Sequence, residues 1–228
     1  MKSQIFGTVM PMVEIELDRG EMIYAQTGAM QWMSEDIDMQ TNMRGGVFGA
    51  LKRGVSGENI FLAHFSAEQS GARVAFGHSF PGKIIEIDVS QKTMICQKRA
   101  FLCATEDVNF DIEFQKKIGM GFFGGEGFIM QRLSGKGTAW VEMDGEYVVK
   151  ELAPGEKIRM ETGALGMYEA GMSLSIDRVK GFKNMFLGGE GLFLTTVEGP
   201  GRVWIQTMPA QNMAMEIARF IPSRNDNK

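Results

Sequence analysis

Residues 13–29 read VEIELDRGEMIYAQTGA, and residues 148–164 read VVKELAPGEKIRMETGA. The two stretches share a leucine, a Gly-Glu pair, an isoleucine and a closing Thr-Gly-Ala triplet at identical spacing. A weaker middle copy starts at Val89, with Ile95 at the isoleucine position and Ala100 at that of the triplet glycine. Self-similarity at a fixed period indicates repeated modules, so we expect three of them.

A second set of anchors repeats in the same order. Glu58, Glu126 and Glu190, which are 68 and 64 residues apart, each follow a glycine and open an apolar stretch. One such carboxylate per module favours a structural corner that accepts turn amides, because general acid-base catalysis needs two convergent groups in one cleft. The anchors predict three tandem pseudo-repeats, at about residues 4–80, 81–145 and 146–208.

Within each module the apolar residues recur with a period of two. Val13, Ile15 and Leu17 alternate with Glu14 and Glu16, which is typical of a half-buried antiparallel strand. Glycine, at 29 of 228 residues, follows no collagen-like period and favours many tight turns. The sequence therefore predicts an all-β fold.

An apolar stripe at helical spacing follows Pro209 and ends before a second proline. The stripe consists of Met213, Ile217 and Phe220. It predicts a short C-terminal helix over residues 210–221 that packs on the sheets. We expect residues 1–222 to form one compact unit and residues 223–228 to fray.

The composition excludes several classes of function. With 24 basic and 28 acidic residues, the chain has a net charge of −4 and no general attraction for nucleic acid, so we expect no DNA partner. The start MKSQIFG resembles no signal peptide, and no run of 18 apolar residues exists. We expect a cytoplasmic protein, either free or peripheral at the inner face of the membrane.

Residues for metal or nucleophile chemistry are scarce. The only histidines are His64 and His78, and no metal-binding motif surrounds either. Cys96 and Cys103 are seven residues apart, which would place them on opposite faces of one continuous strand, as buried and unreactive thiols. We expect neither a cofactor nor an enzymatic activity.

Three segments combine cations, glycines and aromatic residues, and each lies just before one of the Gly-Glu corners. No acid interrupts any of them, and together they carry 8 of the 24 basic residues of an acidic protein. Their candidate assembly or surface-binding residues are Arg44, Phe48, Lys52, Arg53, Lys116, Lys117, Phe122, Phe123, Lys180, Lys183 and Phe186.

Three interpretations of these segments stay open. Cations beside exposed aromatic residues suit an anionic membrane surface with shallow apolar insertion. The same mixture suits single-stranded RNA, with cations on phosphates and rings as stacking platforms. The aromatic residues can instead pack on one another or on a second subunit. We favour assembly, then the membrane surface, over RNA, because apolar loop residues usually mark interfaces.

The repeated motifs carry a family resemblance. With Thr27-Gly28-Ala29, Gly188-Gly189-Glu190-Gly191 and the segment GPGRVW at residues 199–204, the chain resembles the altered-inheritance-of-mitochondria protein 24 family from about residue 4 to 222. The resemblance implies three copies of a fold similar to the tryptophan RNA-binding attenuation protein, a double-stranded β-helix. It also implies trimeric assembly and no known enzymatic activity. The middle module departs from the pattern, with Arg99-Ala100-Phe101 in place of Thr-Gly-Ala.

These observations lead to one leading hypothesis. We expect a non-enzymatic, self-assembling β-protein, a homotrimer that serves as a scaffold or associates with a membrane surface. An RNA-binding module is the alternative, and an uncharacterised enzyme is the second alternative. Mitochondrial relatives are linked to inner-membrane organisation, whereas this chain has no Arg-rich presequence and looks like a bacterial member of the family.

Overall fold

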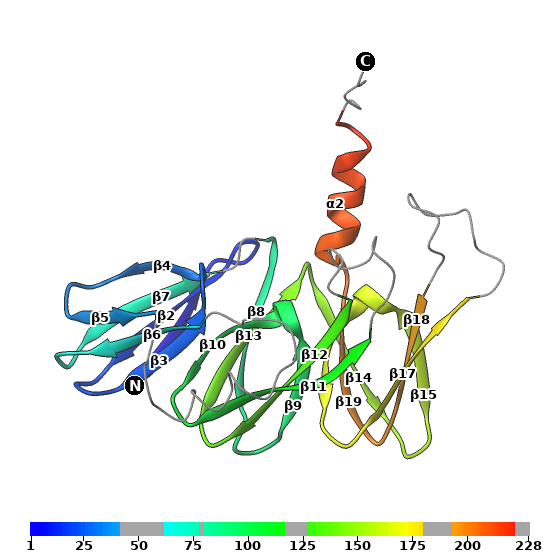
Figure 1. The fold of residues 1–228 in the computed structure, drawn as a ribbon, viewed down its shortest axis with the longest axis horizontal. Coiled ribbons are helices and arrows are strands. Elements are labelled where there is room, and N and C mark those ends of the chain that lie inside the picture. The colour runs from blue at the N-terminus through cyan, green and yellow to red at the C-terminus, as the bar shows by residue number, and fades with distance from the viewer. Residues whose placement is uncertain (42–61, 78–79, 117–126, 180–192, 222–228) are drawn as a thin grey trace.

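The structure is a computed structural model that describes residues 1–41, 62–77, 80–116, 127–179 and 193–221. Over these residues the chain forms four antiparallel sheets and one short α-helix near its C-terminus (Figure 1). The prediction of an all-β fold with a short C-terminal helix is therefore confirmed.

The same order of six strands occurs three times along the chain. Module 1 contains β2 (Met12–Leu17), β3 (Met22–Gln26), β4 (Met30–Met33), β5 (Ile37–Gln40), β6 (Leu62–Ala67) and β7 (Ala72–Gly77), preceded by β1 (Lys2–Phe6). Module 2 contains β8 (Gly82–Asp88), β9 (Met94–Gln97), β10 (Phe101–Thr105), β11 (Val108–Lys116), β12 (Phe128–Gly135) and β13 (Thr138–Asp144). Module 3 contains β14 (Tyr147–Leu152), β15 (Lys157–Glu161), β16 (Leu165–Glu169), β17 (Ser173–Arg178), β18 (Phe193–Glu198) and β19 (Gly201–Gln206), followed by α2 (Ala210–Ala218).

Each module divides its strands into two half-sheets. The first half-sheet has the order β2-β7-β4, β8-β13-β10 or β14-β19-β16, and the second has the order β3-β6-β5, β9-β12-β11 or β15-β18-β17. The second half-sheet of module 1 joins the first half-sheet of module 2 in one six-stranded sheet, β5-β6-β3-β10-β13-β8. The second half-sheet of module 2 joins the first half-sheet of module 3 in the same way, as β11-β12-β9-β16-β19-β14. Neighbouring modules are therefore joined by continuous sheets.

Each junction between modules is a short antiparallel ladder. At the first junction β10 pairs with β3, and Cys103 lies opposite Ala25. At the second junction β16 pairs with β9, and Met167 lies opposite Cys96. All four residues are fully buried, so both junctions belong to the core of the protein.

A β-bulge makes positions in the three modules directly comparable. In β4, β10 and β16 the bulge lies just before Trp32, Cys103 and Met167, where each strand pairs with β7, β13 or β19. The three residues are therefore equivalent, although two of them stand at junctions and Trp32 does not.

The alternating sequence pattern decides which side chains form the core. In β2, Val13, Ile15 and Leu17 are fully buried, whereas Glu14 and Glu16 are only partly covered. These three residues belong to the first of three clusters of buried apolar residues, which also includes Leu102 and Trp140 of module 2. Apolar packing thus crosses the boundary between modules, as the backbone ladder does.

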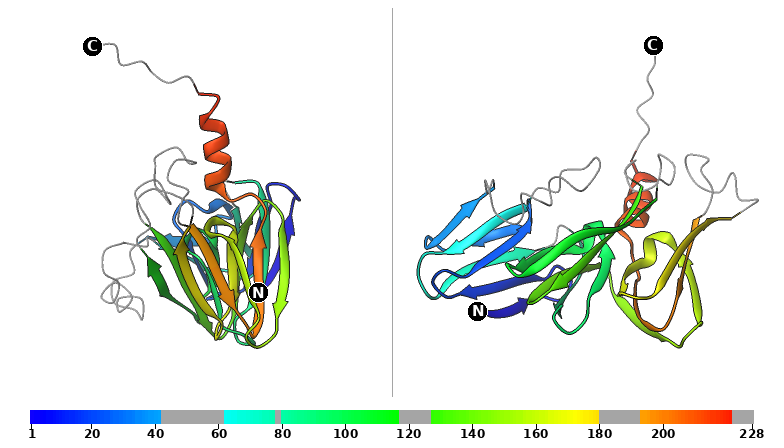
Figure 2. Two further views of the ribbon diagram at one scale, coloured as in Figure 1. Left: turned by 90° about the vertical axis from the view of Figure 1, so that its right-hand side faces the viewer. Right: turned by 60° about the horizontal axis from the view of Figure 1, so that its bottom comes forward.

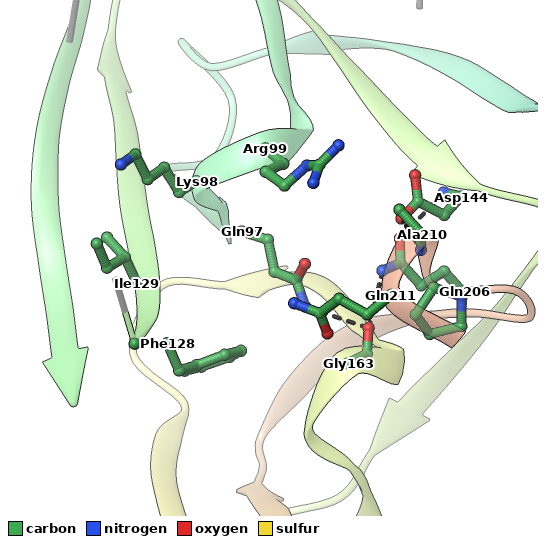
Figure 3. Close-up of a pocket in the computed structure, with 12 residues that line it drawn as sticks. Gln97, Lys98, Arg99, Phe128, Ile129, Asp144, Gly163, Gln206, Ala210 and Gln211 are labelled. Carbon is green, nitrogen blue, oxygen red and sulfur yellow. Dashed lines mark hydrogen bonds between the residues drawn. The ribbon is translucent and has the colours of Figure 1, made fainter. Parts of the chain in front are cut away.

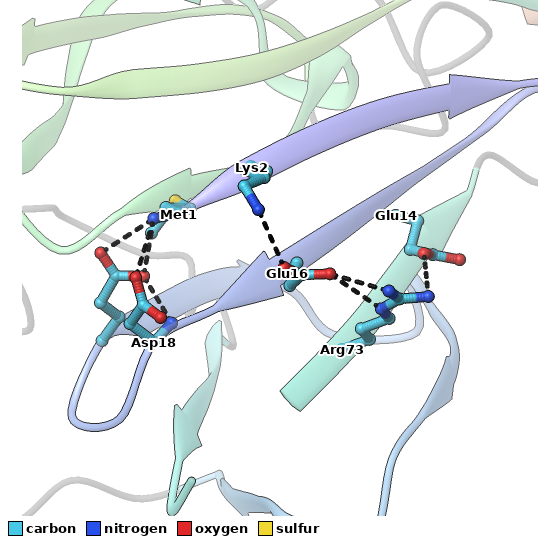
Figure 4. Close-up of polar contacts among 7 residues, drawn as sticks. Met1, Lys2, Glu14, Glu16, Asp18 and Arg73 are labelled. Atoms are coloured by element: carbon cyan, nitrogen blue, oxygen red, sulfur yellow. Dashed lines mark hydrogen bonds and ion pairs between the residues drawn. The ribbon is translucent and has the colours of Figure 1, made fainter. Parts of the chain in front are cut away.

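Strand β1 covers the outer edge of β2, and surface charges surround this pairing (Figure 4). The Lys2 ammonium lies 3.4 Å from a Glu16 carboxylate oxygen, and the Arg73 guanidinium of β7 lies 2.8 Å from the other oxygen. Hydrogen bonds from Arg73 and Lys2 lower the pKa of the Glu16 carboxyl. These ion pairs connect three adjacent strands, and because they are exposed each contributes little to stability.

Helix α2 differs from the expectation in its packing. It projects away from the sheets in Figure 1 and in the left view of Figure 2, and Ala210 is its one buried residue. Ile217 and Phe220 are exposed, so the expectation that the apolar stripe packs on the sheets is wrong. The chain leaves β19 through Pro209 at an end of the sheet, and this exit directs α2 outward.

The cysteines also lie differently from the expectation. Cys96 is in β9 and Cys103 is in β10, with the short 3-10 helix Lys98–Ala100 between the two strands, so they do not share one continuous strand. Both are free and buried, as expected. Burial raises the pKa of the Cys96 thiol to about 12, and it also raises that of Cys103. An equivalent 3-10 helix, Thr162–Ala164, precedes β16, so the departure at Arg99-Ala100 preserves the local backbone.

Candidate functional site

Most residues of the predicted surface-binding set lie outside the described part of the chain. The residues outside it are Arg44, Phe48, Lys52, Arg53, Lys117, Phe122, Phe123, Lys180, Lys183 and Phe186, together with the corner residues Glu58, Glu126 and Glu190. Lys116 is the last residue of β11, where its backbone pairs with Phe128. The structure does show that the three segments join equivalent strands, namely β5 to β6, β11 to β12 and β17 to β18.

A pocket of about 290 Å³ lies where modules 2 and 3 meet the start of α2 (Figure 3). Its lining comes from the 3-10 helix Lys98–Ala100 and its flanks, the start of β12, the end of β13, and the turn before β16. The end of β19 and the first residues of α2 complete it. The lining residues are Gln97, Lys98, Arg99, Gly127, Phe128, Ile129, Asp144, Gly163, Gln206, Pro209, Ala210 and Gln211.

Amide side chains hold the base of this pocket together. The Gln206 Nε2 donates to the Gly163 carbonyl at 2.8 Å, and the Gln97 Nε2 donates to the same oxygen at 3.2 Å. The Gln206 Oε1 accepts from the Asp144 backbone N–H at 3.0 Å. Gln206 thus connects β13, β19 and the turn before β16, which makes its buried amide a positioning group of the junction.

Asp144 holds the beginning of α2. Its Oδ2 accepts from the Ala210 backbone N–H at 2.7 Å, and its carbonyl accepts from Met208. A carboxylate that accepts a backbone N–H in the first turn satisfies one of the donors that a helix start leaves open. The first turn is therefore fixed to β13, even though the rest of the helix projects outward.

A buried acid lies close to this pocket. Glu142 in β13 is 6 % exposed, and burial raises its pKa to about 9. The Asp144 carboxylate raises the pKa further, whereas the Arg99 guanidinium lowers it. Glu142 is therefore protonated at neutral pH.

The pocket residues supply binding groups more readily than catalytic ones. Lys98 and Arg99 bring positive charge, Phe128 and Ile129 bring apolar surface, and Asp144 is engaged with the helix. Nucleophilic catalysis needs a nucleophile, a base within hydrogen-bond distance and an orienting group, and the lining residues hold no such set. Their chemistry suits a small polar or anionic group.

His64, Cys96 and Cys103, the described histidine and cysteines of the chain, are buried. His64 lies in β6, where burial lowers its pKa, and its ring is 6.2 Å from that of Tyr24. No group of three or more metal-binding side chains occurs within the described residues. His78 lies outside them.

Sequence reasoning missed the pocket, because its residues are dispersed. Gln97 and Gln206 have no shared motif, and they meet on one carbonyl only because β16 pairs with β9 across the junction. Pro209 before a helical stripe was the one signal available, and it marks the start of α2 without indicating a cavity.

Large apolar side chains are exposed at the end of α2 and in the residues just after it. Ile217 is 52 % exposed, Phe220 85 % and Ile221 64 %, and Met208 before the helix is also exposed. Glu216 and Arg219 on the same helix pair with each other at 2.8 Å. The helix therefore carries apolar side chains into solvent with almost no net charge. No helix in the described ranges is long and apolar enough to cross a membrane.

Three comparisons relate this architecture to known proteins. A family model described as "Mitochondrial biogenesis AIM24" matches residues 3–208. The uncharacterised protein M6_Spy0233 of Streptococcus pyogenes serotype M6 is 27 % identical over 225 residues, covering 95 % of this chain and 89 % of the relative. The crystal structure of protein SPYM3_0169 from Streptococcus pyogenes is similar with a TM-score of 0.77, at 24 % identity, over 96 % of this chain and 99 % of that one. The last comparison supports the fold.

Proposed function

The chain belongs to the mitochondrial biogenesis AIM24 family, and from that premise we propose that it is a non-enzymatic, self-assembling scaffold that attaches to an anionic membrane surface. The observation that carries the attachment is the group of exposed apolar side chains at the end of α2 and just after it. The Streptococcus pyogenes relative that matches the chain is uncharacterised, so it suggests no activity for this protein. The proposal therefore rests on the chemistry of the surface.

The helix supports shallow insertion into the boundary between headgroups and acyl chains. Helix α2 projects beyond the sheets in the left view of Figure 2, and Ile217 near its end and Phe220 and Ile221 just after it are exposed. Burying a large apolar side chain contributes roughly 1.5–3 kcal/mol, so three of them give useful but reversible affinity. A second attraction is needed for stable attachment.

The three basic segments supply that second attraction in this proposal. They carry 8 of the 24 basic residues of the chain and join equivalent strands in the three modules. Each Lys or Arg near an anionic surface contributes about 1 kcal/mol at physiological ionic strength. Repetition in three modules, and again in each copy of an assembly, multiplies a weak attraction.

Vesicle flotation tests the attachment. We expect the protein to float with anionic vesicles, and less with neutral ones. Two variants should each weaken flotation: Ile217→Ser/Phe220→Ser/Ile221→Ser, and a six-fold Lys/Arg→Ser variant at residues 52, 53, 116, 117, 180 and 183. The Glu216→Ser/Arg219→Ser variant is the matched control, because it removes an ion pair from the same helix without changing its apolar side or the net charge.

Single-stranded RNA is the competing ligand in the same experiment. A gel shift by wild type that the six-fold variant abolishes, without preference for anionic vesicles, would replace the membrane with RNA. Absence of binding to both vesicles and RNA would contradict the proposed attachment. We also expect a homotrimer, which light scattering at micromolar concentration measures independently of either ligand.

A further inference from the structure

Among the residues that the structure describes, the two outermost half-sheets lack a partner that every other half-sheet has. Within the described residues, the first half-sheet of module 1 ends at β4, and the second half-sheet of module 3 ends at β15. Their inner equivalents, β10 with β3 and β16 with β9, pair and complete a six-stranded sheet. The two ends are therefore the two sides of a junction that the chain already forms twice. Figure 1 shows β4 and β15 at opposite ends of the long axis.

Trp32 and Met33 of β4 are exposed at positions whose equivalents are buried at the two junctions. Trp32 is equivalent to Cys103 and Met167, and Met33 is equivalent to Ala104 and Tyr168, as the shared bulge defines. The four inner residues are buried, at 3 % exposure or less, whereas Trp32 and Met33 are each 38 % exposed. A large indole and a thioether thus stand in solvent at positions that a neighbouring module covers elsewhere.

The backbone of both end strands has its hydrogen-bonding groups directed outward at matching positions. The Ser34 N–H donates to the Arg73 carbonyl in β7, so the N–H and C=O of the preceding Met33 point away from that strand. The Gly199 N–H in turn donates to the Glu156 carbonyl, so the backbone groups of Glu156 point toward β18. Successive residues of a strand direct their backbone N–H and C=O groups to opposite sides. Those of Arg159, three residues later, therefore point away from β18. Met33 and Arg159 are therefore the residues through which each edge can accept a strand.

The repeat alignment fixes the register between these edges. Arg159 aligns with Tyr24, which lies opposite Ala104, the equivalent of Met33. At the second junction Tyr168, the other equivalent of Met33, lies opposite Ile95. Ile95 packs in the core of the following module as Tyr24 does, so the structure equates Ile95 with Tyr24, one residue away from the sequence alignment, and both junctions give the same register. Trp32 would thus lie opposite Met160, Met33 opposite Arg159, and Ser34 opposite Ile158. The apolar Met160 and Ile158 are partly or fully covered by their own module, as their counterparts in β3 and β9 are.

Charge complements this register. Extending it by one residue places Glu35 opposite Lys157, and both side chains are exposed. Asp36 and Asp38 stand beside Glu35, whereas Arg159 stands beside Lys157. The residues that follow β4 are thus acidic, whereas the outward residues of β15 are Lys157, Arg159 and Glu161, with a small excess of positive charge because Lys157 also pairs with Glu198 at 3.2 Å. Two β4 edges would repel each other, so the charges favour contact between unlike edges.

We propose that copies of this chain associate head to tail, with β15 of one copy pairing with β4 of the next in the register Met33 opposite Arg159. The inference rests on the self-assembly in the proposed function and names its contact. The joined sheet has the order β2-β7-β4-β15-β18-β17, which is the order of the two internal sheets. A contact between unlike surfaces closes into a ring or grows into a filament. The expected homotrimer is the closed form.

Two proline variants test the contact by light scattering. Met33→Pro and Arg159→Pro each remove an outward N–H and place a ring where the next strand would pair, without removing a donor from the internal ladder. We expect wild type to assemble and each variant to have the 25.3 kDa mass of one chain. An equal mixture of the two variants should give a dimer of twice that mass, because one retains a working β15 and the other a working β4.

Val149→Pro is the matched control. Val149 is exposed on β14, an edge strand of a six-stranded sheet. The Thr207 N–H donates to the Glu146 carbonyl, so by alternation along β14 the Val149 N–H points away from β19. We expect this variant to keep the wild-type mass. If it becomes a monomer while the β4 and β15 variants still assemble, the contact lies on β14 and the proposal is wrong.

A cysteine mixture tests the register without proline. Mixed and oxidised, a Met33→Cys variant and an Arg159→Cys variant should form a disulfide dimer, because directly opposite residues lie within bridging distance. Met33→Cys mixed with Lys157→Cys, two residues out of register, should not. Monomeric wild type would overturn self-assembly together with this contact. Assembly that survives both proline variants and gives no disulfide would overturn the contact alone.

Discussion

Glu142 shows how the interior of this protein treats a single charged residue. It is 6 % exposed in β13, and its raised pKa of about 9 comes first from burial and next from Asp144. At neutral pH the folded state therefore holds a neutral carboxyl that the unfolded chain would ionise. The residue couples the stability of the junction region to pH.

The sign of that coupling gives the first prediction. Between the ordinary pKa of glutamate and about 9, the folded state binds one more proton than the unfolded state, so the free energy of unfolding falls as pH rises. The slope from this group is up to about 1.4 kcal/mol per pH unit. Glu142→Gln should remove this slope and raise the melting temperature at pH 8 relative to wild type. Melting curves from pH 5 to 9 measure it.

Glu151→Gln provides the control for that measurement. Glu151 is exposed on β14 and should leave the wild-type pH profile unchanged. If Glu142→Gln melts in parallel with wild type across the whole pH range, Glu142 is ionised in the folded state and its environment is different from the one described.

At the scale of an element, α2 depends on one side chain of a different strand. The Asp144 carboxylate accepts the Ala210 N–H, whereas the later turns of the helix project into solvent. A nine-residue helix is marginal in water by itself, so its attachment at the first turn decides how long it stays formed. This attachment gives the second prediction.

Asp144→Ala should destabilise the protein by about 1 kcal/mol, the typical cost of losing a helix cap. Because α2 then frays from its start, trypsin should cleave faster after Arg219. Asp144→Asn should retain most of the stability, since its amide oxygen can accept the same bond. Urea unfolding and timed proteolysis measure the two effects. Glu216→Ala, an exposed change on the same helix, should stay within about 0.5 kcal/mol of wild type.

The sequence predicted the elements better than it predicted their partners. Alternation in Val13, Ile15 and Leu17 is a local pattern, so the strand and its buried face could be read directly. The pairing of Cys103 with Ala25 joins segments almost eighty residues apart, and no local pattern encodes that register. The apolar stripe of α2 indicated a helix correctly, but periodicity does not state whether a neighbour exists to cover it.

The candidate site divides in the same way. The basic and aromatic segments could be identified because composition is visible in one dimension. The pocket could not, since Gln97, Gly163 and Gln206 become neighbours only through the second junction.

For the whole molecule, the sheets and core clusters that cross module boundaries couple the stability of each module to that of its neighbour. The first core cluster mixes residues of modules 1 and 2, so neither module can lose its packing without disturbing the other. The third cluster likewise combines Ile95 of β9 with Val203 of β19. We therefore expect the three modules to unfold as one cooperative unit.

Two buried valines at opposite ends test this cooperativity. Val74→Ala in module 1 and Val197→Ala in module 3 each create a small cavity in a fully buried site and should cost roughly 1.5–3 kcal/mol. Each variant should show one calorimetric transition, shifted to lower temperature as a whole. Two resolved transitions in either variant would mean that the modules unfold separately.

The positions of the two cysteines allow the motion of each junction to be timed by chemical labelling. Cys103 packs in a core cluster built mostly from module 1, and Cys96 packs in a cluster that also contains Met167 and Trp204 of module 3. A maleimide can reach either sulfur only when the packing around it has opened, and peptide mass spectrometry distinguishes the two sites. If the labelling rate is independent of maleimide concentration, it equals the opening rate; if it rises in proportion, it gives the opening equilibrium. One unaltered sample would then show which junction opens first.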